Sequence, residues 1–218
     1  MRTSPVILLV CCLLSTAAQA QGFKFSNDDA QAADAAEQAQ RDATVQALLA
    51  TPCRNHIRNR KIMVLVGEET SGTVMAQQGS FGGHVEKINT RLRGLGLQTY
   101  SPEQIRRQVA QAEIDAYFRN DADAALGASR RLAAQYVLRG VIASRADRNR
   151  MANLNQVSVR MDFTLSEASG RPVATASATN QSYAGADTSG MALTLIDERV
   201  DEVVARLYSE YCKNAGVR

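Results

Sequence analysis

Tryptophan is absent from this chain of 218 residues, and Phe, Tyr and Trp together account for only 5% of it. A densely packed core therefore has to be built mainly from Val, Leu, Ile and Ala. Hydrophobic residues make up 45% of the sequence and charged residues 22%, which is the composition of an ordinary globular protein. The length fits one domain with an additional segment.

Histidine is also scarce. Only His56 and His84 are present, and neither has the C-x-x-C, H-x-x-x-H or carboxylate spacing of a metal site. No serine lies in a G-x-S-x-G motif. We therefore predict no metal, no cofactor, no catalytic residues and a protein that is not an enzyme. A hydrolase with a dispersed site is the alternative, because a Ser-His-Asp triad assembles in space.

A large excess of charge is missing as well. The formal net charge is +3, and the chain without Arg2 would carry +2. Nucleic-acid-binding proteins usually carry a strong basic patch. We therefore predict no nucleic-acid partner.

The amino terminus has the pattern of a secretory signal. Arg2 precedes the apolar run VILLVCCLL at residues 6–14, and Ala18-Gln19-Ala20 matches a signal-peptidase site. The run is far shorter than the roughly 20 residues of a membrane-spanning helix. No small-residue box precedes Cys11 or Cys12, as lipid anchoring would require. We predict a signal peptide at residues 1–20, cut after Ala20, and a bacterial periplasmic protein with no transmembrane segment in the mature chain.

Removal of the signal leaves two cysteines, Cys53 and Cys212. Disulfides persist in an oxidising compartment, and a lone pair of cysteines there usually forms one. We predict a Cys53–Cys212 disulfide that closes a very long loop. Two free buried thiols are the alternative.

Gly67 and Gly72 have the G-x-x-x-x-G spacing of a phosphate-binding loop, but no Lys precedes Thr73. Glu68 and Glu69 would also repel a phosphate at close range. We therefore predict no nucleotide. Residues 67–83 are expected to form a long surface loop instead, and such loops commonly carry recognition. This expectation makes Glu68 and Glu69 candidate partner-binding residues.

Residues 27–50 are rich in Ala, Gln and Asp and favour a helix. Its apolar bulk appears only late, at Val45, Leu48 and Leu49. We predict a helical arm over residues 21–52, either solvated or acting as a spacer or coiled-coil segment that meets a partner. The compact domain is predicted over residues 53–218.

Within that domain, apolar periodicity and turn residues indicate the elements. Strands are expected at residues 61–66, 97–100, 136–144, 157–165 and 173–179. Helices are expected at residues 83–93, 102–118, 120–135 and 191–213. The order β-α-β-α-α-β-β-β-α predicts an α+β fold, a mixed α/β sandwich in which helices pack on one sheet.

Three arginines, Arg145, Arg148 and Arg150, fall in a polar loop that is predicted over residues 145–155 between two strands. They either solvate a hairpin tip and discourage edge pairing, or form a docking patch for an acidic partner or an anionic envelope polymer. They are candidate partner-binding residues. Arg54, Arg58, Arg60 and Lys61 form a second basic cluster.

Two short phrases resemble a known family. A helix ends in the phrase A-x-Y-V-L-x-G, and a strand then ends in L-x-E-x-S-G; the matching residues are Ala134, Tyr136, Val137, Leu138, Gly140, Leu165, Glu167, Ser169 and Gly170. This pattern resembles the periplasmic αβ domain shared by penicillin-binding-protein activator lipoproteins, the CsgG curli-secretion family, the TolB amino-terminal domain and flagellar H-ring proteins. The resemblance covers residues 60–212. This sequence lacks the lipid-anchor cysteine of that family and the added strands of a secretion channel.

The resemblance implies a binding module. We predict a non-catalytic periplasmic adaptor of a cell-envelope assembly, in cell-wall synthesis, a flagellar or pilus base, or a secretion machine. Its partners would be envelope proteins. The alternative is a structural subunit that forms a ring, a homo-oligomer, through the helical arm.

Overall fold

The computed structural model describes residues 27–76, 82–151 and 153–214. The predicted signal peptide and its cleavage site lie outside the described residues. The chain divides into two units, Met1–Glu37 and Gln38–Arg218. In the first unit the described residues belong to α1 (Asn27–Leu49), and in the second unit Leu49 of the same helix packs against the core.

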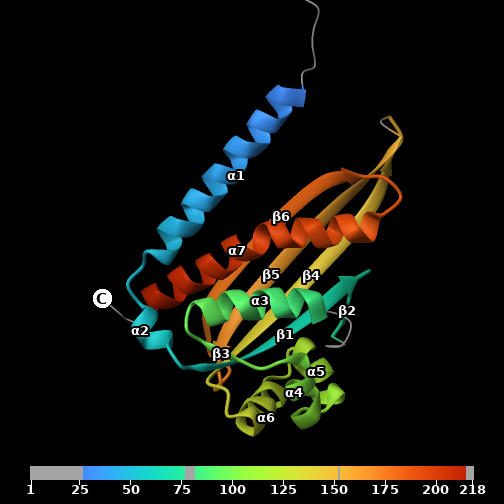
Figure 1. Cartoon of the computed structure of the whole chain (residues 1–218). Coiled ribbons are helices and arrows are strands. Elements are labelled where there is room, and N and C mark those ends of the chain that lie inside the picture. Colours follow the sequence, from blue (N-terminus) through green and yellow to red (C-terminus); the bar gives the residue numbers. More distant parts are fainter. Residues whose placement is uncertain (1–26, 77–81, 152, 215–218) are drawn as a thin grey trace, which may run out of the picture. The chain divides into compact units, whose positions relative to one another are not determined.

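The second unit contains one six-stranded mixed sheet with helices packed on it (Figure 1). This confirms the predicted α+β class. After α1, the elements are α2 (Arg54–Ile57), β1 (Lys61–Thr70), β2 (Thr73–Met75), α3 (Gly82–Gly94), β3 (Gln98–Thr99), α4 (Pro102–Gln108), α5 (Gln111–Phe118), α6 (Ala122–Leu132), β4 (Tyr136–Asn149), β5 (Leu154–Glu167), β6 (Pro172–Ala184) and α7 (Thr188–Asn214).

The strand order is β2-β1-β4-β5-β6, and β3 also pairs with β1. β1 runs parallel to β4, with Ile62 opposite Tyr136 and Glu69 opposite Ala143. A parallel pair needs a crossover connection, and the helices α3 to α6 supply it. β4, β5 and β6 form an antiparallel meander, as the alternation of the sequence predicts.

The sheet separates two hydrophobic clusters. Ile62, Val64 and Val66 of β1 point to the cluster that contains α3 and α7. Met63 and Leu65 point to the cluster that contains α4, α5 and α6. Burial on both faces explains why β1 is a continuous apolar run rather than an alternating one. The second cluster includes residues of β1 and β4 but none of β5 or β6.

The prediction of a single helix over residues 102–118 is wrong, because the structure has two helices there, α4 and α5. Ser101 and Gln104 form a capping box that starts α4, and the helix ends at Val109, whose backbone is extended (φ −119°, ψ 123°). The Glu113 carboxylate then accepts the backbone N–H of Ala110 and starts α5. Val109 is apolar and buried in the core, so the helical spacing of apolar residues continues through a position where the backbone is not helical.

The long loop predicted over residues 67–83 is also wrong in its first part. β1 continues to Thr70, and Ser71 and Gly72 make a turn to β2. Both turn residues have positive φ (53° and 81°), as a two-residue type I′ hairpin turn requires. Gly72 is therefore a hairpin glycine rather than part of a phosphate loop. Residues 77–81 lie outside the described part of the chain.

Gly140 is required by a close contact between β4 and β5. It lies opposite Phe163, and a Cβ at this position would overlap the Phe163 ring. Gly140→Ala is expected to lower the free energy of unfolding by about 2 kcal/mol, since the ring has to move within a packed core. Chemical denaturation measures this change. The control is Gly94→Ala, where a Cβ has no heavy atom within 4 Å; an equal loss there would contradict the explanation.

Candidate interaction surface

The β4–β5 hairpin runs past the end of β1. Its two strands pair from Tyr136 and Glu167 to Asn149 and Leu154, whereas the pairing of β4 with β1 ends at Glu69 and Ala143. Residues 144–149 therefore lie on a part of the hairpin that β1 does not border, and Figure 1 shows this end extending beyond it. The loop predicted at residues 145–155 is consequently wrong, because only residues 150–153 separate the strands.

Arg145 and Arg148 lie on this part of the hairpin, and Arg150 follows in the turn. Arg145, Arg148 and Arg150 are exposed, and none forms an ion pair with a residue that the structure describes. The Arg148 guanidinium donates a hydrogen bond to the amide oxygen of Asn153 across the turn. Asp147 is the acidic residue between them, so the segment keeps a net positive charge.

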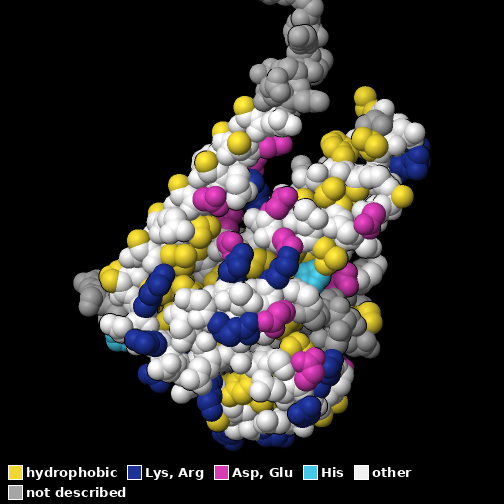
Figure 2. Space-filling model, viewed as in Figure 1, with side chains coloured by type: hydrophobic (Ala, Val, Ile, Leu, Met, Phe, Trp, Pro, Cys, Tyr) yellow, Lys and Arg dark blue, Asp and Glu magenta, His cyan; other side chains and the backbone are white. Residues whose placement is uncertain are grey.

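Exposed apolar side chains accompany the arginines. Met151, in the turn, is 100% exposed, Leu154 is 45% exposed and Tyr183 of β6 is 50% exposed. Tyr183 pairs with Gln156, close to the start of β5. Figure 2 shows hydrophobic and basic side chains gathered at this end of the molecule. We call the set of Arg145, Arg148, Arg150, Met151, Leu154 and Tyr183 the hairpin end.

The structure places the acidic candidates at the base of this projection. Glu68 is half-buried near the end of β1, and its carboxylate accepts a hydrogen bond of 3.1 Å from the Ser144 hydroxyl. Ser144 directly precedes Arg145. Glu69 is exposed and lies opposite Ala143. The two glutamates therefore border the start of the arginine segment, whereas Arg150 lies at its far end.

Sequence reasoning missed Met151, Leu154 and Tyr183. A signal was present, because Met151 is a large apolar residue inside the polar stretch RADRNRMANLN. Tyr183 could not be assigned, since the predicted strand ends at residue 179 and the structure continues β6 to Ala184.

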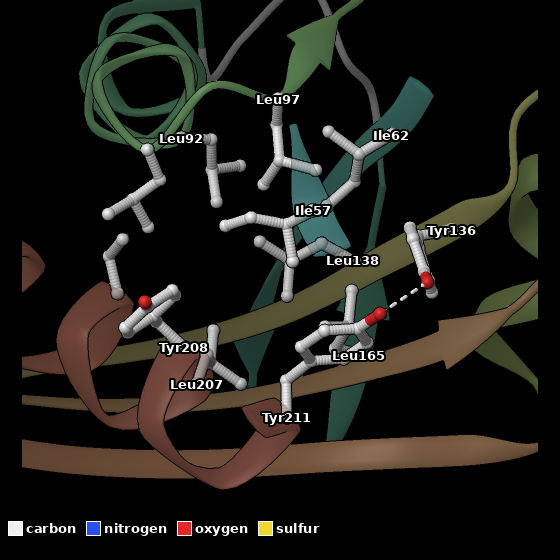
Figure 3. A pocket seen from close by; sticks show the side chains of 12 residues that line it. Ile57, Ile62, Leu92, Leu97, Tyr136, Leu138, Leu165, Leu207, Tyr208 and Tyr211 are labelled. Atoms are coloured by element: carbon white, nitrogen blue, oxygen red, sulfur yellow. Dashed lines mark hydrogen bonds between the residues drawn. The ribbon is translucent and has the colours of Figure 1, made fainter. Parts of the chain in front are cut away.

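An apolar cavity of about 30 Å³ lies in the core, between α2, α3, α7 and the sheet (Figure 3). The Tyr136 and Tyr211 hydroxyls form a hydrogen bond of 2.7 Å at its wall. Burial, and then this hydrogen bond, raise the pKa of Tyr211 above its ordinary value. A cavity of this size has room for only very few water molecules, and its apolar walls offer them few hydrogen-bond partners. It is a small packing defect rather than a ligand site.

The acidic residues of α7 are structural. Asp197 pairs with Lys87 and Asp201 with Arg91, so both join α7 to α3. Glu202 pairs with Arg199 and Arg206 along α7. Asp197, Asp201 and Glu202 therefore all take part in ion pairs.

Burial lowers the pKa of His84, and the nearby Glu68 raises it to a smaller extent. Across residues 27–76, 82–151 and 153–214, His, Cys, Asp and Glu do not gather in a group of three or more that could hold a metal. In the same ranges no helix combines the length and the apolar character needed to cross a membrane.

Comparison with known proteins gives similarity at the level of structure. No family model matches the chain. A search of curated proteins finds no match. The lipoprotein GNA1162 from Neisseria meningitidis is 13% identical, with 66% of this chain and 97% of that chain covered and a TM-score of 0.47. A PelC dodecamer from Paraburkholderia phytofirmans is 21% identical, with 70% and 89% covered and a TM-score of 0.41.

The LpoB C-terminal domain from Salmonella enterica is 18% identical, with 65% of this chain and 95% of that chain covered and a TM-score of 0.39. These three matches are similarities of structure at low sequence identity. The more specific resemblance to CsgG, TolB and flagellar proteins stays a prediction.

Proposed function

We propose that this chain is a non-catalytic periplasmic adaptor of a bacterial cell-envelope assembly, and that it binds a protein partner through the hairpin end. One observation carries the proposal. Three arginines without a described carboxylate partner lie beside a fully exposed methionine, on a hairpin that extends past its neighbouring strand.

The residue types at the hairpin end are those of binding surfaces. Arg, Met and Tyr are enriched at protein interfaces, and Arg and Tyr are frequent among the residues that contribute most to affinity. The fold itself gains little from them. No residue of β4 beyond Ile142 belongs to either hydrophobic cluster, although Val157 and Val159 of the paired strand β5 do. A partner that suits this surface has acidic groups around an apolar pocket that receives Met151.

Glu68 and Glu69 extend the proposed surface toward β1. Their negative charges at the base of the hairpin lie next to the positive segment, so the charge of the surface changes from negative to positive along β4. Such a charge pattern fixes the orientation of a partner more than it adds affinity.

A photo-crosslinking residue placed at Met151 tests the proposal in intact cells. We expect it to capture one reproducible envelope protein. The control position is Ser169, an exposed residue in the turn at the opposite end of β5. Absence of a protein adduct at position 151, or the same adduct from position 169, would contradict the proposed surface.

Charge removal provides the quantitative test. Replacing Arg145, Arg148 and Arg150 together by Ala is expected to lower the affinity for the captured partner by more than about tenfold, since desolvated charges at an interface each contribute substantially. The matched control removes three other exposed arginines, Arg54, Arg58 and Arg60, and should change the affinity little. Titration with the purified partner measures both variants.

A further inference from the structure

β6 forms an edge of the sheet, because β5 is its neighbour on one side and no other strand of the described chain pairs with it on the other. The strand is 13 residues long, from Pro172 to Ala184. The opposite edge is built from the short strands β2 and β3. Long edges invite pairing with another chain, and proteins normally protect them.

The direction of the backbone groups along β6 follows from two contacts with α7. The Thr175 N–H donates to the Glu210 carboxylate (2.8 Å), and the Val173 carbonyl accepts from the Asn214 amide (2.9 Å). These groups point away from β5. Because antiparallel strands alternate, the odd-numbered residues of β6 direct their N–H and C=O groups outward.

Only part of this edge is satisfied by the chain itself. Besides Thr175, the Gln181 N–H has a partner, the side-chain oxygen of Asn180 (3.1 Å). The outward N–H groups of Ser177 and Thr179 meet no acceptor within the described ranges. Both residues are exposed. Within the described chain, the edge therefore has unpaired backbone N–H groups at Ser177 and Thr179, and we call this part of β6 the open window.

The usual protection against pairing is missing in this window. β6, PVATASATNQSYA, contains no charged residue, and its one proline is at the first position. Lysine, central proline and a bulge are the devices that normally block an edge. The irregularity in β5–β6 pairing lies at Leu165 and Ser166, away from the window.

We propose that β6 pairs antiparallel with β6 of a second copy of this chain, around a two-fold axis between Ser177 and Thr179. In this register Ser177 lies opposite the second copy's Thr179, so the two open N–H groups of each copy meet open carbonyls of the other. Thr175 and Gln181 then oppose each other, and both of their N–H groups already have partners within the chain. A strand without charge can pair with itself without placing like charges opposite each other. This proposal is independent of the hairpin end.

The first test removes one outward donor. Thr179→Pro deletes an N–H that the β5–β6 ladder does not use, and proline is tolerated at such an edge position. Two hydrogen bonds are lost per dimer, so the dimer dissociation constant should rise by about 30-fold. Thr179→Val keeps the N–H and should leave the constant within about twofold. Sedimentation of the full purified chain up to millimolar concentration gives the constants.

The second test identifies the occupant. Thr179→Lys and Thr179→Glu each place like charges diagonally across the axis and should weaken their own dimers by several-fold. Mixing the two variants should restore dimerisation, because the charges then attract. If the strand that pairs with β6 came from a different protein, mixing the two variants would not restore pairing.

A wild-type chain that stays monomeric at millimolar concentration would overturn the proposal. This holds even if β6 is found to bind an extended peptide of another protein. Dimers that Thr179→Pro and both charged variants leave unchanged would overturn it too, since pairing would then use another surface. Thermal unfolding of each variant shows whether it is folded, and the charged pair keeps the test decisive if the proline variant is not.

Discussion

Loss of the Cys53–Cys212 disulfide is expected to lower the free energy of unfolding by about 3–5 kcal/mol. The structure contains this bond, with a Cα–Cα distance of 5.6 Å and 159 residues of sequence separation. Closing so long a loop restricts the unfolded chain strongly, and the chain-entropy model gives about 5 kcal/mol for it. Both cysteines are buried in the core, and Cys212 is a residue of α7.

Other contacts at the same place argue for the lower part of this range. The Cys53 N–H donates to the Tyr208 hydroxyl (3.2 Å), which in turn donates to the Thr51 carbonyl. The Thr51 and Ser209 hydroxyls are also hydrogen-bonded at 3.3 Å. These bonds hold the segment against α7 without the disulfide, so the folded state should persist in its absence.

The measurement compares wild type with and without reductant and a variant carrying Cys53→Ala and Cys212→Ala. The melting temperature of both the reduced protein and the variant should fall by about 10 °C, given the usual relation for a domain of this size. Reductant should not change the variant further. An unchanged melting temperature in both cases would contradict the prediction.

Truncation of Leu207 is expected to lower the free energy of unfolding by about 3 kcal/mol. Leu207 is 3% exposed and lines the apolar cavity of Figure 3 together with Leu92 and Leu138. Leu207→Ala enlarges a cavity that already exists, and its other walls are formed by packed side chains of α2, α3 and the sheet. The site can therefore collapse only in part.

Leu193→Ala is the matched control, because Leu193 lies on the same helix and is 49% exposed. The chemical change and its effect on helix propensity are the same in both variants. We expect the control to change the free energy of unfolding by less than about 0.5 kcal/mol. Urea denaturation separates the two, and equal losses would mean that burial of Leu207 is not what stabilises α7.

Elements with one or two apolar faces could be predicted from the sequence. β1 is a continuous apolar run because both of its faces are covered, and β5 alternates because one face is covered. The start of α4 follows from Ser101 and Pro102, which cap and begin the helix. In each case a local chemical signal and the burial in the fold agree.

Elements without a buried face gave no such signal. Residues 144–149 of β4 are mostly exposed, so their polar sequence reads as a loop although they pair with β5 throughout. β2 is short, and the turn glycine that forms it also satisfies a phosphate-loop spacing. Tertiary hydrogen bonding, which the hydropathy pattern does not encode, determined these strands.

The candidate site was predicted in part. The three arginines were selected from their clustering, and the structure places them on one projection beside Ser144 and Glu68. The position of the exposed apolar side chains beside them is determined by strand register. The register places Tyr183 opposite Gln156, although the two are far apart in the sequence. Register could not be read from a strand whose open face is polar.

The parallel pairing of β1 with β4 also has a consequence for biosynthesis. Residues 62–67 of β1 are all buried in the finished protein, yet residues 71–135 are made before β4, the strand that pairs with most of β1, begins at Tyr136. A nascent chain therefore leaves the edge of this aliphatic segment that pairs with β4 open while those residues are translated. We expect β1 to be the principal binding site for holding chaperones until the meander is complete.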